Sequence, residues 1–235
     1  MSHNDLPSEM QSHQQINSAR VVVFDVDGTL YDARRLRRRM LTEILLYCLG
    51  DPRRLTLLRT LHVYRCEREK LADQEATNII ALQYERPAAL LQVPPGEIES
   101  KITPWIHKRP LRHLETTRVS GVRRFFDHLR DSGRKLGVLS DYPAASKLKA
   151  LGLPADCVVA STDPEVNRLK PHPAGLELLI RKLDADPSEC LLIGDRDSRD
   201  GEVARRLEMP YYLRVARASD PYREFTDYLE LLPHF

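Results

Sequence analysis

Acidic, hydroxyl and lysine side chains follow several short apolar runs in this sequence. Asp25 and Asp27 come directly after the first run, Ser140 ends the second, Lys170 lies beyond the third and Asp195 follows the fourth. In open α/β sheets, ligands bind at the carboxyl ends of the strands. If the runs are strands of one sheet, these five side chains are therefore candidates for a shared binding or catalytic site.

Such a set of side chains favours phosphoryl-transfer chemistry. Several carboxylates in one place are unfavourable unless a cation neutralises them. Oxygen ligands suit Mg²⁺, which often binds through one or two carboxylates together with phosphate oxygens. A lysine and a hydroxyl would complement the remaining phosphate charge. Of the two aspartates Asp25 and Asp27, one could attack phosphorus while the other moves protons.

The apolar runs have the length and composition of strands that are buried on both faces. They cover residues 21–24, 135–140, 157–161, 190–194 and 211–215. Helical periodicity lies between them, as in residues 121–133, which end at Gly133, and residues 173–183, which begin at Pro173. Alternating strands and helices predict an α/β fold with a doubly wound, mostly parallel sheet.

Residues 33–116 differ because they contain no strand-like run and repeat apolar residues at helical spacing. The repeating positions are Leu36, Met40, Ile44, Tyr47, Leu57, Leu58, Leu61 and Tyr64. Breaks rich in proline or charge lie at residues 92–97 and 108–110. We therefore expect an inserted helical cap of residues 33–116, a core of residues 15–32 and 117–235, and a flexible lead-in of residues 1–14. The aromatic residues expected inside the cap are Tyr64, Tyr84 and Trp105.

The composition favours a globular protein in a reducing compartment. Lys and Arg number 36 against 34 Asp and Glu, and the net charge of +2 argues against binding to nucleic acid through bulk charge. No run approaches the ~18 apolar residues of a membrane span, and residues 1–19 lack the apolar segment of a signal peptide. We therefore expect a cytoplasmic protein without a membrane partner, and leave its oligomeric state open. Without a CxxC pair, the cysteines are expected to be buried thiols rather than disulfide or zinc residues: Cys48, Cys66, Cys157 and Cys190.

Four segments together resemble the motifs of the haloacid dehalogenase (HAD) superfamily. They are FDVDGTL (24–30), VLSD (138–141), KPHP (170–173) and IGDRDSRDG (193–201). They occur in the family order, and each follows a strand-like run. The resemblance covers residues 20–231. It implies a Rossmann-like core, a helical cap inserted after the first strand, and a Mg²⁺-dependent phosphatase that hydrolyses a small phosphorylated metabolite through an aspartyl-phosphate.

The resemblance also implies roles for individual residues. Asp25 would be the nucleophile, and Asp27 would be the general acid and then the general base. Thr29 and Ser140 would bind the transferring phosphoryl group. Lys170 would hold both the nucleophile and the phosphate oxygens.

The same resemblance implies a Mg²⁺ site built by three positions. Its ligands would be the Asp25 carboxylate, the backbone carbonyl of Asp27, and Asp195. Asp200 would orient these ligands more than bind the metal directly. Asp197 lies in the same motif, so either Asp197 or Asp200 could approach the metal.

Other reactions and roles stay open at this point. A phosphomutase would share the phospho-aspartate, and a phospho-aspartate switch would share the sheet, acidic residues, hydroxyl and lysine. Asp27 argues against a dehalogenase, and no pattern marks Lys70 or Lys101 as the cap lysine that phosphonate hydrolysis would need. Five arginines are expected to form a solvated helix face, although one or two could instead attract an anionic substrate to the cleft: Arg34, Arg35, Arg37, Arg38 and Arg39.

Overall fold

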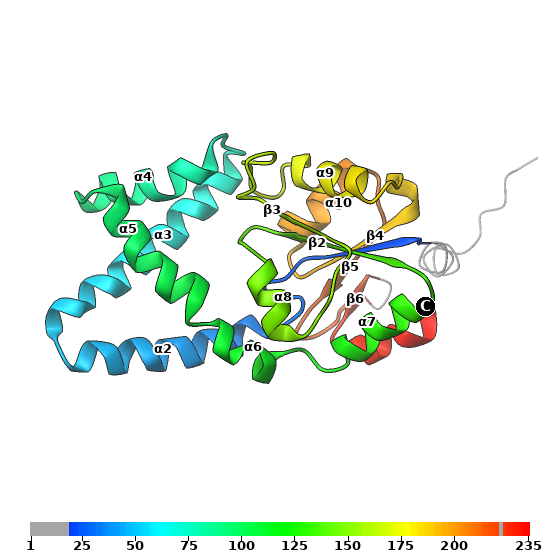
Figure 1. The fold of residues 1–235 in the computed structure, drawn as a ribbon, viewed down its shortest axis with the longest axis horizontal. Coiled ribbons are helices and arrows are strands. Elements are labelled where there is room, and N and C mark those ends of the chain that lie inside the picture. The colour runs from blue at the N-terminus through cyan, green and yellow to red at the C-terminus, as the bar shows by residue number, and fades with distance from the viewer. Residues whose placement is uncertain (1–18, 221–222) are drawn as a thin grey trace, which may run out of the picture.

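The sheet has the predicted architecture. The computed structural model describes residues 19–220 and 223–235 (Figure 1), so the expected lead-in of residues 1–14 lies outside the described residues, as do residues 15–18. One parallel sheet has the strand order β3-β2-β1-β4-β5-β6. The bounds are β1 Val21–Phe24, β2 Lys135–Ser140, β3 Cys157–Ala160, β4 Cys190–Gly194, β5 Tyr211–Arg214 and β6 Glu224–Phe225. The predicted α/β fold is confirmed, and only β6 was missed, because two residues leave no recognisable apolar run.

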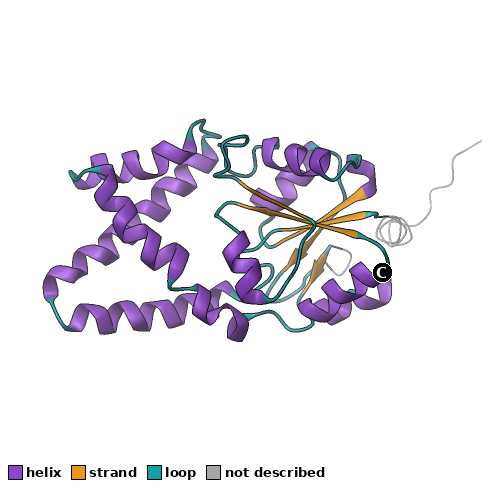
Figure 2. Ribbon diagram, in the orientation of Figure 1, coloured by secondary structure: helices purple, strands orange, loops and turns teal. Residues whose placement is uncertain are grey.

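Helices cover both faces of the sheet and fill the segment between β1 and β2 (Figure 2). The bounds are α2 Ala33–Leu49, α3 Thr56–Asp73, α4 Ile79–Leu91, α5 Pro95–Ile102, α6 Leu111–Thr117, α7 Val122–Asp131, α8 Ala145–Leu151, α9 Ala174–Lys182 and α10 Glu202–Arg206. The helices predicted at residues 121–133 and 173–183 correspond to α7 and α9. In Figure 1, α2 to α5 stand beside the sheet rather than on one of its faces.

The sheet is buried on both faces because alternate side chains of a strand point to opposite sides. In β1, Val22 and Phe24 belong to the apolar cluster that contains α7, and the Phe126 ring lies 4.4 Å from the Phe24 ring. Val21 and Val23 belong to a second apolar cluster, together with apolar residues of α9 and α10. Every residue of β1 is fully buried. This central strand therefore gives a rigid support to the residues that follow it.

Helix α2 shows how the sequence builds the segment beside the sheet. It begins after Asp32, whose side chain accepts hydrogen bonds from the backbone N–H groups of Arg34 and Arg35. Its buried stripe consists of Leu36, Met40, Ile44 and Cys48. The expectation that Tyr47 belongs to this stripe is wrong, because Tyr47 is 38% exposed. Cys48 takes the position instead, since residues four apart share one face of a helix.

Most remaining expectations for single side chains hold. Tyr64 and Trp105 are buried, and Tyr84 is half-buried. All four cysteines are free, and Cys48 and Cys190 are buried as expected, whereas Cys157 is only half-buried. The expectation of a buried thiol is wrong for Cys66, which is exposed on the outer side of α3. No helix in the described part of the chain is both long and apolar enough to cross a membrane.

Phe126 joins α7 to the central strand, and we predict that Phe126→Ala destabilises the fold. The ring is fully buried against Phe24, so its removal leaves a cavity and should lower the free energy of unfolding by about 3–5 kcal/mol. Urea denaturation followed by circular dichroism measures this change. Arg124→Ala, on the exposed side of α7, is the control and should stay within about 0.5 kcal/mol of the parent chain. A similar small change for Phe126→Ala would contradict the assigned packing.

Candidate active site

The ends of β1 and β4 bring two aspartates together. The strands are neighbours with Phe24 opposite Ile193, and the Asp25 backbone N–H donates to the Ile193 carbonyl at 2.9 Å. Asp25 and Asp195 therefore follow adjacent strands at the same edge of the sheet. Gly28 lets the loop after β1 pass close to the Asp195 side chain. It has a φ of +103°, and a Cβ at this position would lie 2.0 Å from an Asp195 carboxylate oxygen.

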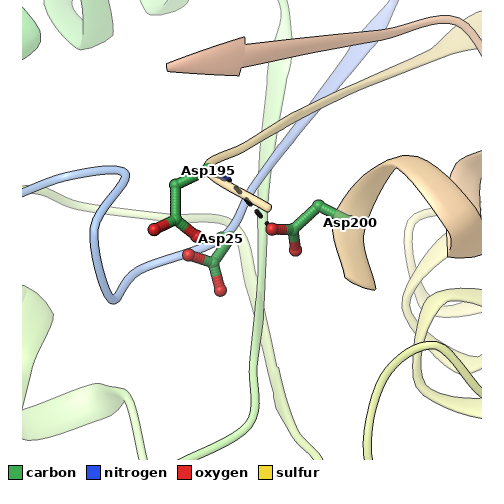
Figure 3. A group of neighbouring side chains, drawn as sticks. All are labelled: Asp25, Asp195 and Asp200. Atoms are coloured by element: carbon green, nitrogen blue, oxygen red, sulfur yellow. Dashed lines mark hydrogen bonds between the residues drawn. The ribbon is translucent and has the colours of Figure 1, made fainter. Parts of the chain in front are cut away.

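Asp200 completes a group of three carboxylates with Asp25 and Asp195 (Figure 3). One oxygen from each lies within 4.8 Å of the others. The backbone N–H groups of Asp195 and Arg196 each donate to Asp200 Oδ2 at 3.1 Å and fix its direction. Gly194 allows this close approach, since a Cβ on it would lie 2.3 Å from the Asp200 Cβ.

Lys170 bridges two members of this group. Its Nζ donates to Asp25 Oδ1 at 2.6 Å and to Asp200 Oδ1 at 2.6 Å. The Thr29 hydroxyl donates to the other oxygen, Asp25 Oδ2, at 2.9 Å. Lys170, Thr29, Asp25 and Asp200 are all buried. The predicted lysine and threonine thus contact the predicted nucleophile directly.

The electrostatics of the group call for a further positive charge. Burial raises the pKa of Asp25 well above its usual range, Lys170 opposes this, and the Asp200 and Asp195 carboxylates add to it. Burial, and then Asp200, raise the pKa of Asp195 to about 7. Although burial disfavours its charged form, Asp200 and Asp25 raise the pKa of Lys170 above its usual range. One lysine cannot balance three carboxylates, of which Asp25 and Asp200 are buried and Asp195 is half-buried, and no described side chain donates a hydrogen bond to the Asp195 carboxylate. The residues therefore fit a divalent cation that prefers oxygen ligands.

Asp27 has separate partners. Its carboxylate accepts two hydrogen bonds from Lys147 Nζ, at 2.5 and 2.7 Å, and one from the Tyr31 hydroxyl. Burial alone would raise the pKa of Asp27, but the Lys147 ammonium outweighs it, helped by Tyr31, and lowers the pKa below its usual range. The Asp27 carboxylate is therefore ionised at neutral pH and is directed to Lys147 rather than to the three-carboxylate group.

A small cleft lies over these residues. It has a volume of about 90 Å³ and is lined by Asp25, Asp27, Arg68, Glu69, Ala72, Asp141, Tyr142, Leu169, Lys170, Asp195, Arg196, Arg199 and Asp200. Ser140 is fully buried and is absent from this lining, and its hydroxyl oxygen accepts from the Tyr142 backbone N–H at 3.2 Å. The volume is below the ~300–1,000 Å³ of ordinary ligand pockets, so it suits a phosphoryl group with a small substituent.

The side chains of Asp197 and Asp200 point in different directions. Asp197 accepts from Arg205 Nη1 at 2.8 Å and from the Tyr211 hydroxyl at 3.0 Å, and its side chain is 59% exposed. Asp200 is buried within the acidic group. Both oxygens of Asp200 are occupied by Lys170 and backbone donors, an arrangement typical of a residue that orients ligands.

The arginines at the cleft are different from those considered in the sequence. Arg34, Arg35, Arg37, Arg38 and Arg39 are exposed, as a solvated helix face requires, and none lines the cleft. Arg68, Arg196 and Arg199 line it instead. The burial of Arg68 could have been predicted from the sequence, because Arg68 continues the buried stripe of α3 that contains Leu61 and Tyr64. The contact of Lys147 with Asp27 could not have been predicted, since the sequence around a lysine on a short helix does not indicate its partner.

Ion pairs join α3 to the loop after β4. Arg196 donates to both Glu69 oxygens at 2.9 and 2.8 Å, and Arg199 Nη2 donates to Glu69 at 3.0 Å and to Asp73 at 2.6 Å. The loop that carries Asp200 is therefore tied to a helix from the segment beside the sheet. Two of the three cleft arginines thus have carboxylate partners.

Comparisons with known proteins confirm the resemblance that the motifs indicated. The model of the haloacid dehalogenase-like hydrolase family matches residues 19–207. Putative phosphatase YhcW of Bacillus subtilis (strain 168) is 31% identical over 110 residues, which are 45% of this chain but only 49% of YhcW, so the chain spans about half the length of that relative. Pyrophosphatase PpaX of Bacillus thuringiensis (strain Al Hakam) is 26% identical over 183 residues, 74% of this chain and 73% of PpaX. The structure of the putative HAD-hydrolase YfnB of Bacillus subtilis bound to magnesium is similar in fold, with a TM-score of 0.64 and 15% identity over 91% of this chain and 96% of YfnB.

Glu69 should stabilise the protein in a pH-dependent way. Hydrogen bonds from Arg196, and then from Arg199, lower its pKa from 4.5 to about 2. The stabilisation is therefore complete above pH 4.5 and is lost as the pH falls toward 2. Because the Glu69 side chain is 53% exposed, its full contribution should not exceed about 1 kcal/mol.

We predict that Glu69→Gln lowers the free energy of unfolding at neutral pH and that the gap to the parent chain narrows below pH 4.5. Urea denaturation at a series of pH values measures the gap. Glu85→Gln, at an exposed position of α4, is the matched control and should stay within about 0.5 kcal/mol of the parent chain at neutral pH. A gap for Glu69→Gln that stays constant through this range would count against the ion pairs.

Proposed function

Because the chain belongs to the haloacid dehalogenase-like hydrolases, we propose that it is a Mg²⁺-dependent phosphatase that hydrolyses a small phosphomonoester through an aspartyl-phosphate. The observation that carries this proposal is the Asp25 carboxylate, which contacts Lys170 and Thr29 and shares a three-carboxylate group at the cleft. The names of the relatives YhcW and PpaX, a putative phosphatase and a pyrophosphatase, support phosphoryl chemistry. The magnesium bound to YfnB supports the choice of metal.

In the first step, a carboxylate oxygen of Asp25 attacks phosphorus and the bond from phosphorus to the leaving oxygen breaks. Asp27 gives its proton to that oxygen. The lowered pKa of Asp27 in the free protein means that this proton must first be taken up. The approach of a negative phosphoryl group favours the uptake, because like charge raises the pKa of a carboxyl group. Lys170 balances charge on the phosphoryl oxygens.

In the second step, water attacks the phosphorus of the aspartyl-phosphate and gives a proton to Asp27. The bond between phosphorus and the Asp25 oxygen breaks, which releases inorganic phosphate and restores the carboxylate. The ionised form of Asp27, which Lys147 favours, is the form that this step needs.

Asp25, Asp195 and the backbone carbonyl of Asp27 would hold Mg²⁺, with Asp200 orienting the site. The ion would neutralise the carboxylates and polarise the phosphoryl oxygens. We also propose that residues 33–116 form a cap over the cleft; the contacts of Glu69 with Arg196 and Arg199 support this division.

Asp25→Asn should abolish phosphate release, because an amide cannot act as the nucleophile. The assay measures inorganic phosphate released from a panel of small phosphomonoesters in the presence of Mg²⁺, and we expect a loss of at least about 1,000-fold. Asp197→Asn is the matched control, since Asp197 pairs with Arg205 outside the acidic group and should keep full activity.

The products of the same assay separate the alternatives. Isomerised sugar phosphate without free phosphate would favour a mutase, and a persistent phosphoprotein with negligible turnover would favour a phospho-aspartate switch. Full phosphatase activity of Asp25→Asn would overturn the mechanism.

Mg²⁺ should stabilise the folded protein, because it neutralises buried carboxylates that are costly in its absence. At a concentration 100 times its dissociation constant, the ion should add about 2.7 kcal/mol to the free energy of unfolding. Bound metal is first removed with EDTA, and the Tm is then measured without and with added Mg²⁺, which should raise it. Asp195→Asn should reduce this rise, whereas Asp197→Asn should retain it. An equal rise in both variants would exclude Asp195 as a ligand.

A further inference from the structure

Arg68 is a buried cation at the cleft without an ion-pair partner in the described part of the chain. It lies on α3, lines the cleft together with Asp25 and Asp27, and is only 4% exposed. Arg196 and Arg199, which line the same cleft, are paired with Glu69 or Asp73. Among the described residues, Arg68 therefore differs from the other two cleft arginines in having no carboxylate within ion-pair distance.

The contacts of Arg68 are with neutral groups. Its Nη1 donates to the side-chain oxygen of Gln83, and its Nη2 donates to the Asp141 backbone carbonyl at 2.6 Å. Its guanidinium carbon lies 4.2 Å from the centre of the Tyr142 ring, a cation–π contact. The Asp141 carboxylate is used elsewhere, because it accepts from the Ser161 hydroxyl at 2.8 Å and from the Lys170 backbone N–H at 3.1 Å.

This environment orients the guanidinium, and the described residues supply no carboxylate that forms an ion pair with it. Gln83 is itself held by Tyr64, whose hydroxyl donates to the same Gln83 oxygen at 2.9 Å. A guanidinium has five N–H donors, of which two have assigned acceptors. A buried charge is costly unless an opposite charge pairs with it. Such a preoriented fork suits an anion that enters the cleft.

In the proposed mechanism, Lys170 and the cation that the acidic group fits already balance the charge of the transferring phosphoryl group. We propose that Arg68 determines substrate specificity by binding a second anionic group, a carboxylate or a phosphate, on the leaving-group side of the substrate. This inference rests on the proposed phosphatase function. The small volume of the cleft limits the spacing, so the second anion should lie only a few bonds from the phosphorus that is attacked.

The test compares three probes that differ in the anionic group they carry beside the phosphoryl group that is transferred. Inorganic phosphate release is measured with Mg²⁺ on 2-phosphoglycolate, which carries a carboxylate, on inorganic pyrophosphate, which carries a second phosphate, and on ethyl phosphate, which carries neither. The parent chain should show a higher kcat/KM for 2-phosphoglycolate or for pyrophosphate, which have a second anionic group, than for ethyl phosphate. The preferred probe identifies the second anion as a carboxylate or a phosphate.

Arg68→Met should lower kcat/KM for the preferred probe on the order of 10- to 100-fold, as expected for hydrogen bonds to a charged group. The kcat/KM for ethyl phosphate, which has no second anionic group, should fall much less than that for the preferred probe, so its turnover also reports that the variant is folded. Arg68→Lys should recover part of the preference, since it keeps the charge but loses the fork. Arg65→Met, at an exposed position on the same helix, is the matched control and should change neither probe.

Each other outcome has a distinct meaning. Equal kcat/KM of the parent chain on all three probes would overturn this inference and leave the phosphatase function intact, whether or not the variants fold. An equal loss on all probes in Arg68→Met would assign Arg68 to general support of the cleft and would also overturn it. Phosphate release from none of the probes or the wider phosphomonoester panel would overturn the proposed function itself, and this inference with it.

Discussion

The Lys170 ammonium lies between two buried carboxylates, and the rest of the site depends on this contact. Asp25 comes from the end of β1 and Asp200 from the loop after β4, so Lys170 connects three separate segments of the chain. The lysine makes the close approach of the acids tolerable, but it leaves the Asp195 carboxylate without a donor among the described residues. The site therefore has a deficit of positive charge at one edge of the sheet, an arrangement that fits a divalent cation.

The charged groups at the cleft are of two kinds: some form ion pairs that support the structure, and Arg68 is available to bind an anion. Arg196 and Arg199 are paired with acids of α3, and these pairs hold the two sides of the cleft together. Arg68 is buried against neutral partners, and Asp27 is paired with Lys147 away from the acidic group. The Arg68 guanidinium, which has no ion-pair partner among the described residues, lines the same small space as the Asp27 carboxylate, and an anionic substrate there would balance the charge of Arg68.

Several features could be predicted from the sequence because they depend on local patterns. A strand buried on both faces must be a continuous apolar run, so β1 to β5 were recognisable, whereas the two residues of β6 were not. Asp25, Thr29, Lys170 and Asp200 were identified by spacing within short motifs. Tyr47 was misjudged because the phase of an amphipathic helix is ambiguous by one residue when apolar side chains adjoin. Cys66 was misjudged because the absence of a CxxC pair does not show which face of a helix carries a cysteine. Arg68 was overlooked as one more charge in a charged helix.

The sequence by itself determined the class of fold, the strand ends at which the polar side chains lie, and a set of acids that fits a cation. These follow from periodicity and from residues only a few positions apart. Only the tertiary structure decided that Asp200 rather than Asp197 joins the acidic group, that Lys147 is the partner of Asp27, and that Arg68 faces the cleft. The physical reason is that these contacts join segments far apart in the chain, and electrostatic partners are set by distance and burial, which spacing along a sequence does not encode.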